Sequence, residues 1–191
     1  MEDEDFWLLD LTYDSSYTIY LGDGTNSLEL IGYGTIISSR ARVIINSNAF
    51  KNCSKLVRIW IEGNNVAQIG SRAFLNCTSL NSITLPSTLT SIGGMAFYNC
   101  SGLTQITING NISTLGAGAF SECKNVKKLT LGADVTSIPS NLFSTGLSTN
   151  LTEIVVLGDL NSTTFPSGTW TKGGTTVTQF SGAGTYLKSE E

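Results

Sequence analysis

The chain has 191 residues, a net charge of −4 and a charged fraction of 14%, below the roughly one quarter that is usual for a soluble domain. Short polar residues and glycine take the place of the charged ones, which is typical of turn-rich β structure. The acidic balance argues against nucleic acid as a partner, because neutralising phosphates requires a basic face, and no apolar run approaches the ~20 residues of a membrane span.

Residues 1–42 form the first predicted unit, an N-terminal cap. The segments SYTIYL and SLELIG alternate apolar and polar residues on either side of GDGTN, which predicts a β-hairpin. The start, MEDEDFWLLD, is acidic where a secretory signal is basic, and it lacks an adequate apolar core. We therefore expect either that a signal was removed from the chain or that the protein does not use that export route.

Charge is unevenly distributed over the first third of the chain. Residues 1–35 contain eight acidic residues and no lysine or arginine. The stretch that follows has no acid and five basic residues, namely Arg40, Arg42, Lys51, Lys55 and Arg58. The pattern has two interpretations: a solvated acidic cap beside a basic first repeat, or a docking patch.

A repeat of about 23 residues occupies the middle of the chain. Its marker is a phenylalanine that recurs after 24, 23, 23 and 23 residues, followed three residues later by a cysteine in the first four copies. The phenylalanines are Phe50, Phe74, Phe97, Phe120 and Phe143, and the cysteines are Cys53, Cys77, Cys100 and Cys123. The strand-like segments are LVRIWI at 56–61, LNSITL at 80–85, LTQITI at 103–108, VKKLTL at 126–131 and LTEIVV at 151–156. Apolar positions that recur in register in this way predict a solenoid.

The spacing within one repeat indicates its shape. Each L-x-x-I-x-I segment alternates like a strand with one buried face, and a return path of ~23 residues requires parallel neighbours stacked about 4.8 Å apart. The A-F-x-x-C segment is predicted to form a short turn or 3-10 piece on the opposite side. One repeat buries about six apolar side chains, each of which contributes roughly 1.5–3 kcal/mol. Ordering its ~23 residues costs about 1–2 kcal/mol of backbone entropy per residue, which is more than this gain. One repeat is therefore expected to fold only together with its neighbours.

The units IGSRAFLNCTSLNSITLPSTLTS and IGGMAFYNCSGLTQITINGNIST resemble the BspA-type (Treponema-like) leucine-rich repeats, which are marked by I-x-x-x-A-F-x-x-C-x-x-L-x-x-I-x-L-P. The resemblance covers five repeats over residues 43–160. Only Pro86 occupies the family's proline position, and the last repeat has Gly146 in place of the cysteine and a longer linker, so this repeat is expected near the end of the stack. The resemblance implies a surface-exposed bacterial or protozoan protein that acts in adhesion and protein binding.

Residues 161–191 are predicted to form a C-terminal cap, because TWT and TTVTQF flank KGG in the manner of a second hairpin. An open stack needs such caps to cover its edges, although either cap could instead carry a partner-specific function. The expected fold is thus a mainly β, right-handed leucine-rich-repeat coil. It has a parallel sheet on one face, short turns opposite, and irregular β caps at both ends.

The residue types argue against an enzyme. Histidine is absent, which removes Ser-His-Asp, Cys-His and ordinary zinc-hydrolase arrangements, and we expect no cofactor and no metal. The cysteines are interpreted as a file of small buried side chains, with disulfides between neighbours as the alternative, whereas a linear file cannot converge on one metal ion. Asn52, Asn76 and Asn99 begin glycosylation-like N-C-S/T triplets, but their shared repeat position favours hydrogen bonds to the turn backbone.

Side chains that alternate with the buried strand positions are expected to project from the sheet as a binding surface. Trp60 beside Arg58 combines two residue types that are favoured in binding hot spots, although the N-terminal cap could instead cover Trp60. The candidate partner-binding residues are Arg58, Trp60, Glu62, Gln105, Thr107, Lys128 and Glu153.

Two functions remain open at this point. The first is a protein-binding or adhesion module that is extracellular or displayed at a cell surface, with a protein or surface glycan of a host as its partner. The second is a structural component of a larger assembly, such as a phage tail, fibre or baseplate, which would be located in the virion and bind a neighbouring subunit.

Overall fold

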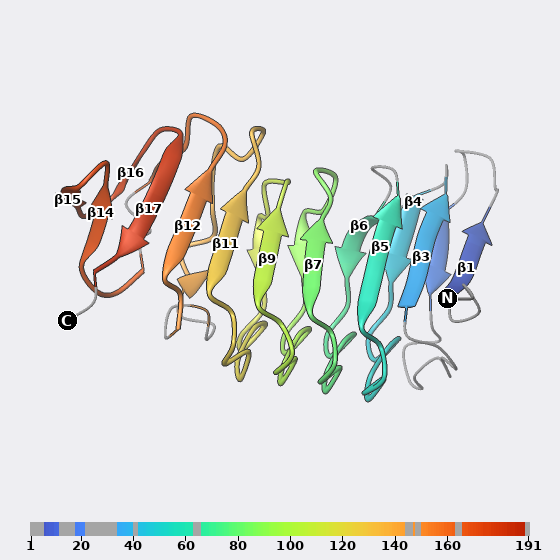
Figure 1. Cartoon of the computed structure of the whole chain (residues 1–191). Coiled ribbons are helices and arrows are strands. Elements are labelled where there is room, and N and C mark those ends of the chain that lie inside the picture. Colours follow the sequence, from blue (N-terminus) through green and yellow to red (C-terminus); the bar gives the residue numbers. More distant parts are fainter. Residues whose placement is uncertain are drawn as a thin grey trace.

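The computed structural model describes residues 6–11, 18–21, 34–39, 42–62, 66–143, 147, 150–162 and 166–189, with the side chains of 6–11, 18–21, 34–39, 42, 60–62 and 161–162 left out. Within these ranges the chain consists of β-strands and turns and contains no α-helix (Figure 1). None of the described residues forms a helix long and apolar enough to cross a membrane.

The main sheet has ten strands in the order β1-β3-β5-β7-β9-β11-β12-β17-β14-β15. Pairing is parallel from β1 to β12 and antiparallel among the last four strands. The parallel strands are β1 (Phe6–Leu11), β3 (Gly34–Ser39), β5 (Arg58–Glu62), β7 (Ser82–Leu85), β9 (Gln105–Ile108), β11 (Lys128–Leu131) and β12 (Glu153–Val156). The remaining strands are β14 (Trp170–Lys172), β15 (Thr175–Val177) and β17 (Gly184–Lys188).

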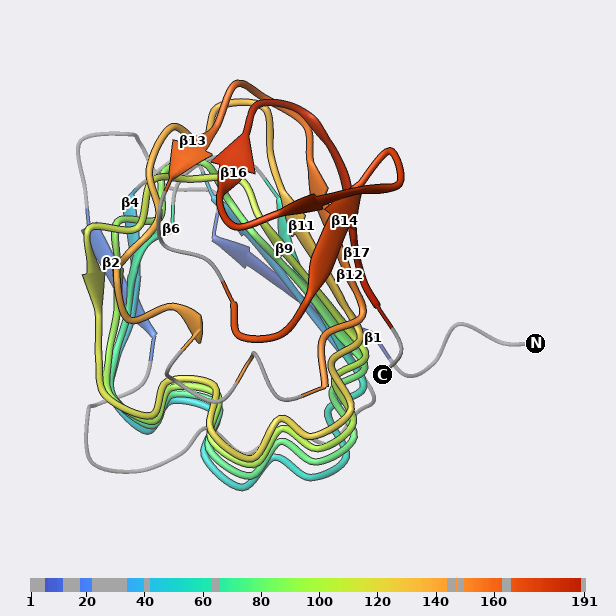
Figure 2. The same cartoon turned by 90° about the vertical axis from the view of Figure 1, so that its left-hand side faces the viewer.

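A second parallel sheet of five strands covers the other side of the coil (Figure 2). Its strands, in sheet order, are β10 (Thr114–Leu115), β8 (Ser91–Ile92), β6 (Val66–Ile69), β4 (Arg42–Ile45) and β2 (Thr18–Leu21). A two-stranded sheet pairs β13 (Asn161–Ser162) with β16 (Phe180–Ser181). In Figure 1 the parallel strands of the main sheet run upward in front, the second-sheet strands run downward behind, and the chain advances from right to left, so the coil is right-handed. The predicted mainly β solenoid is confirmed.

The N-terminal region extends this architecture. The strands described there pair in parallel, β1 with β3, β3 with β5 and β2 with β4. The predicted hairpin around GDGTN falls mainly on residues 22–33, outside the described residues. The division of the chain at residue 42 stays a prediction.

Turn segments at 46–57, 70–81, 93–104 and 116–127, here called the first to fourth turns, join the two sheets. Backbone hydrogen bonds also connect successive turns: Phe50 N–H donates to Ala73 O at 2.7 Å, and Phe74 N–H donates to Ala96 O at 2.7 Å. The A-F-x-x-C segment forms the predicted turn, but the second sheet occupies the side opposite the main sheet, and the turns form a third hydrogen-bonded side between the two sheets. Neighbouring coils are therefore hydrogen-bonded to one another on three sides, with one register shift between β4 and β6.

The phenylalanine and cysteine columns align as predicted over the first four repeats. Rings of adjacent turns from Phe50 to Phe120 stack with centroids 5.0, 5.1 and 5.2 Å apart. The four cysteines are free thiols. Cys77 Sγ donates to Phe50 O, Cys100 Sγ to Phe74 O and Cys123 Sγ to Phe97 O, each at 3.1 Å. These three thiols thus each donate to a carbonyl of a preceding coil, which gives the column polar contacts inside an apolar core.

The asparagine column bonds differently from the prediction. Asn52, Asn76 and Asn99 have φ values of 64°, 62° and 56°, a left-handed conformation that asparagine tolerates well. The Asn76 amide donates to Asn52 Oδ1 at 2.9 Å, and the Asn99 amide donates to Asn76 Oδ1 at 3.0 Å. The acceptor is thus the asparagine of the preceding coil, because the stack places identical side chains one above another.

The C-terminal strands close the end of the core (Figure 2). β14 and β15 form the hairpin expected for this segment, with Gly173 and Gly174 at φ values of 57° and 79° in its turn. Trp170, Phe180 and Tyr186 are each 0% exposed. The fifth repeat phenylalanine, Phe143, packs against Phe180 with centroids 6.3 Å apart. Large aromatic side chains therefore cover the apolar interior that the last coil would otherwise expose.

Close backbone contact between coils requires glycine at the start of several turns. A Cβ atom added to Gly93 would overlap the backbone of Gly70 and Ser71 in the preceding turn. The next residue, Gly94, has ordinary space, since the nearest atom to an added Cβ is Ala117 O at 3.4 Å. Gly93 therefore has no room for a side chain, whereas the adjacent Gly94 does.

We predict that Gly93→Ala lowers the free energy of unfolding by roughly 1–3 kcal/mol, because the added methyl group forces two backbones apart. Gly94→Ala is the matched control and should change stability by less than about 1 kcal/mol. Urea denaturation followed by circular dichroism measures both values. Equal effects at the two positions would contradict the close approach of the coils.

We also predict that Cys77 and Cys100 resist alkylation by iodoacetamide at pH 8 until the chain unfolds. Burial raises the pKa of the Cys77 thiol, and the neighbouring Cys123 thiol together with burial raises the pKa of Cys100, so neither forms the reactive thiolate in the folded state. Peptide mapping by mass spectrometry, with and without urea, checks this. Rapid labelling of Cys100 in the folded protein would show that the column is not buried.

Candidate functional site

The outward face of the main sheet presents two rows of side chains. In β7 the side chains of Ile83 and Leu85 are buried at 2% and 0% exposure, while Thr84 between them is exposed. Residues that pair on neighbouring strands lie on the same face of the sheet, so the residues paired with Ser82 and Thr84 also face outward. The first row consists of Arg58, Ser82, Gln105, Lys128, Glu153 and Leu187. The second row consists of Thr84, Thr107, Thr130, Val155 and Thr185.

The structure brings most of the predicted residues together. Arg58, Gln105, Lys128 and Glu153 occupy the first row, and Thr107 lies in the second. Trp60 and Glu62 belong to β5 by their backbone, but their side chains lie outside the described ones, so both interpretations of Trp60 stay open.

Two charges of the first row pair with each other. Lys128 Nζ lies 2.9 Å from Glu153 Oε1 on the neighbouring strand, and the two side chains are 40% and 33% exposed. An ion pair this accessible to solvent contributes little to stability. Its effect on the surface is to neutralise the region around β11 and β12, so the outward face is mainly neutral and hydrogen-bonding there.

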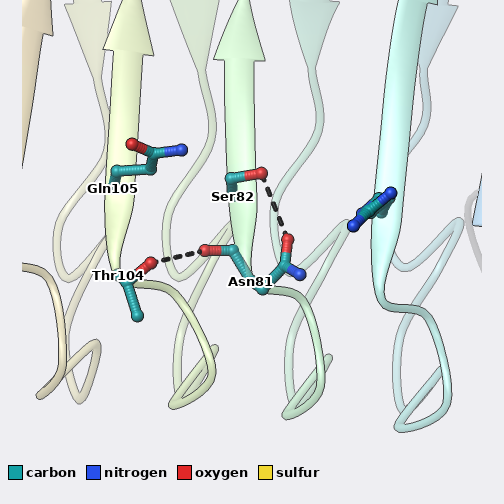
Figure 3. A pocket seen from close by; sticks show the side chains of 5 residues that line it. Asn81, Ser82, Thr104 and Gln105 are labelled. Carbon is teal, nitrogen blue, oxygen red and sulfur yellow. Dashed lines mark hydrogen bonds between the residues drawn. The ribbon is translucent and has the colours of Figure 1, made fainter.

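A shallow polar hollow lies at the other end of the row. Its volume is about 390 Å³, and it is lined by Arg58, Asn81, Ser82, Thr104 and Gln105. Ser82 Oγ donates to Asn81 Oδ1 at 3.1 Å, and Thr104 Oγ1 donates to Asn81 O at 3.2 Å. Figure 3 shows Ser82 and Gln105 on neighbouring strands with Asn81 and Thr104 directly below them. Side chains that can form hydrogen bonds, from three successive coils, thus line the same hollow.

Sequence reasoning missed some residues of this surface. Asn81 and Thr104 directly precede their strands, where alternation gives no signal, although their common repeat position, 23 residues apart, could have revealed them. Leu187 is 50% exposed and enters the row through antiparallel pairing of β17 with β12. The row therefore changes from a basic and polar end at β5 to an apolar end at β17.

The described residues contain no group of three or more His, Cys, Asp or Glu side chains placed to hold a metal ion.

Comparison with known proteins places this geometry in a family. The BspA type Leucine rich repeat region matches residues 43–168 in six copies, which extends into the segment assigned to the C-terminal cap. A search of curated proteins finds no match.

Two solved structures are similar to this chain. The leucine-rich-repeat protein TpLRR of T. pallidum aligns with a TM-score of 0.52 and 26% identity, covering 84% of this chain and 77% of that one. A leucine-rich-repeat protein from Bacteroides ovatus aligns with a TM-score of 0.41 and 28% identity, covering 59% of this chain and 36% of that one. The chain belongs to the BspA-type leucine-rich-repeat family.

Proposed function

We propose that the chain is a non-enzymatic adhesion module that captures a protein partner on the outward face of its main sheet, outside the cell or at its surface. Leucine-rich-repeat domains generally mediate protein interactions, and BspA-type repeats are typically found in surface or extracellular proteins. The observation that carries the proposal is the polar hollow at Arg58, Asn81, Ser82, Thr104 and Gln105, where three coils contribute to one site.

The chemistry of the hollow supports a polar contact as the anchor. One arginine and four neutral hydrogen-bonding side chains line it, and its 390 Å³ volume is enough for one or two partner side chains. Arginine is favoured in binding hot spots, since its planar group forms several directed hydrogen bonds. The two rows that continue from the hollow supply neutral threonines and a paired Lys128–Glu153, which fit the polar surround of a protein interface.

The solenoid makes this surface rigid. Backbone hydrogen bonds on three sides hold the strands in place, so binding costs little reordering of the face itself. An adhesion surface built this way gains affinity by repetition, because each added coil extends the same two rows.

We predict that Arg58→Ala/Gln105→Ala weakens partner binding by tenfold or more, a typical cost for hot-spot truncation, with little change in melting temperature. The partner is first captured from a cell-surface extract of the host with the immobilised protein, and its affinity is then measured by biolayer interferometry. Gln68→Ala is the control, since Gln68 is an exposed strand glutamine on the second sheet.

Loss of binding only in the Arg58/Gln105 variant supports the proposal. Unchanged affinity in that variant, or an equal loss in Gln68→Ala, would remove the outward face of the main sheet from the function. Capture of the chain by itself, seen as larger species in light scattering, would instead favour a subunit of a larger assembly.

A further inference from the structure

The stretch from β3 to the fourth turn has an excess of positive charge, in a protein that is acidic as a whole and in which eight acids occur in residues 1–35. Residues 34–121 contain six basic residues and one acidic residue, Glu62, while the complete chain has a net charge of −4. Three of the six basic side chains lie on the turns and not on the main sheet: Lys51, Lys55 and Arg72. We call these three side chains the basic turn surface.

Hydrogen bonds between the first and second turns hold these residues on adjacent coils. Asn48 N–H donates to Ser71 O at 3.0 Å, and Asn52 N–H donates to Leu75 O at 2.7 Å. Arg72 follows Ser71, and Lys51 precedes Asn52. Lys55 and Arg72 are exposed and Lys51 is half-buried. Three cations are thus presented on two rigidly stacked loops, on a different side of the coil from the main-sheet rows.

On the fourth turn, a lysine on the same side of the coil is neutralised by an ion pair. Lys124 Nζ lies 2.6 Å from Glu122 Oε2, which cancels its charge locally. Among the described residues the ion pairs are this one and Lys128–Glu153, and neither involves the basic turn surface. The eight acids of residues 1–35 have side chains outside the described ones.

The surroundings favour an anionic polymer over a protein as the ligand. The large apolar side chains that are exposed among the described residues are Met95, Leu157 and Leu187, and only Met95 lies on a turn next to this surface. Protein interfaces are enriched at their centre in apolar and aromatic side chains and depleted in lysine, whereas this surface has two lysines and a single exposed methionine beside it. A polyanion is held mainly by charge and hydrogen bonds, which lysine and arginine on a rigid surface supply.

Sulfated polysaccharide fits better than nucleic acid. Proteins that bind single-stranded nucleic acid combine a basic groove with aromatic platforms for the bases, and no aromatic residue is exposed on the first two turns. We propose that the basic turn surface binds a sulfated polysaccharide of a cell surface or matrix, as a second contact separate from the main-sheet site.

The test uses a heparin-derived octasaccharide and the complete chain, with affinity measured by isothermal titration calorimetry at several salt concentrations. Lys55→Ser/Arg72→Ser removes two exposed charges from the proposed surface. Lys124→Ser/Lys127→Ser is the matched control, since it removes two exposed lysines from the fourth turn and changes the net charge equally. Circular dichroism confirms that each variant is folded.

We expect the octasaccharide to bind the wild type with a strong salt dependence, and the Lys55/Arg72 variant to bind about five- to tenfold more weakly with a shallower slope. The control variant should keep the wild-type affinity. Absence of binding, or an equal loss in both variants, would overturn the proposal. So would equal affinity for a desulfated octasaccharide or tighter binding of a single-stranded DNA of equal charge.

Discussion

Backbone hydrogen bonding between successive coils is the constraint on which the rest of this structure depends. Strands bond in parallel on two sides of the coil, and the turns bond on the third. Because of this bonding, equivalent positions of successive coils lie at a constant distance from each other. Similar residues at these positions therefore form columns inside and outside the coil. The stacked phenylalanines at 5.0–5.2 Å are a direct consequence of this constant distance. The thiol-to-carbonyl bonds of the cysteines add directional contacts to the same interior.

The same constraint separates the functions of the faces. Inward positions are used for packing and for the thiol-to-carbonyl bonds, whereas outward positions are free to vary between coils without disturbing the stack. This freedom explains why the first row can change from Arg58 through Gln105 to Leu187 while Ile83, Ile106 and Leu129 stay aligned beneath it. It also explains how the first two turns can carry a charge pattern unlike that of the later ones. We propose that the main-sheet rows and the basic turn surface are two independent binding surfaces of one scaffold.

The sequence predicts the coil well because the same residue types recur every 23 or 24 residues. Such a repeat buries its apolar residues only when successive copies stack on one another. It does not predict the second sheet, since β8 and β10 have two residues each and are too short for alternation to be visible. Alternation also cannot distinguish a hairpin from parallel strands of further coils, which is why β2 pairing with β4 was not foreseen. The site is predictable where a residue alternates within a repeat strand. Asn81 precedes its strand, and Leu187 arrives from the cap by long-range pairing, so neither follows that rule.

Amide hydrogen exchange followed by NMR tests the central claim most directly, because it reports whether the turns are bonded to one another in solution. The amides of Phe50, Phe74 and Phe97 donate to carbonyls of the following coil in this structure. They should exchange as slowly as strand amides such as that of Ile106. Exchange as rapid as at the exposed Gly173–Gly174 turn would show that the third side is not bonded, and would contradict the rigid stack from which both proposed surfaces derive.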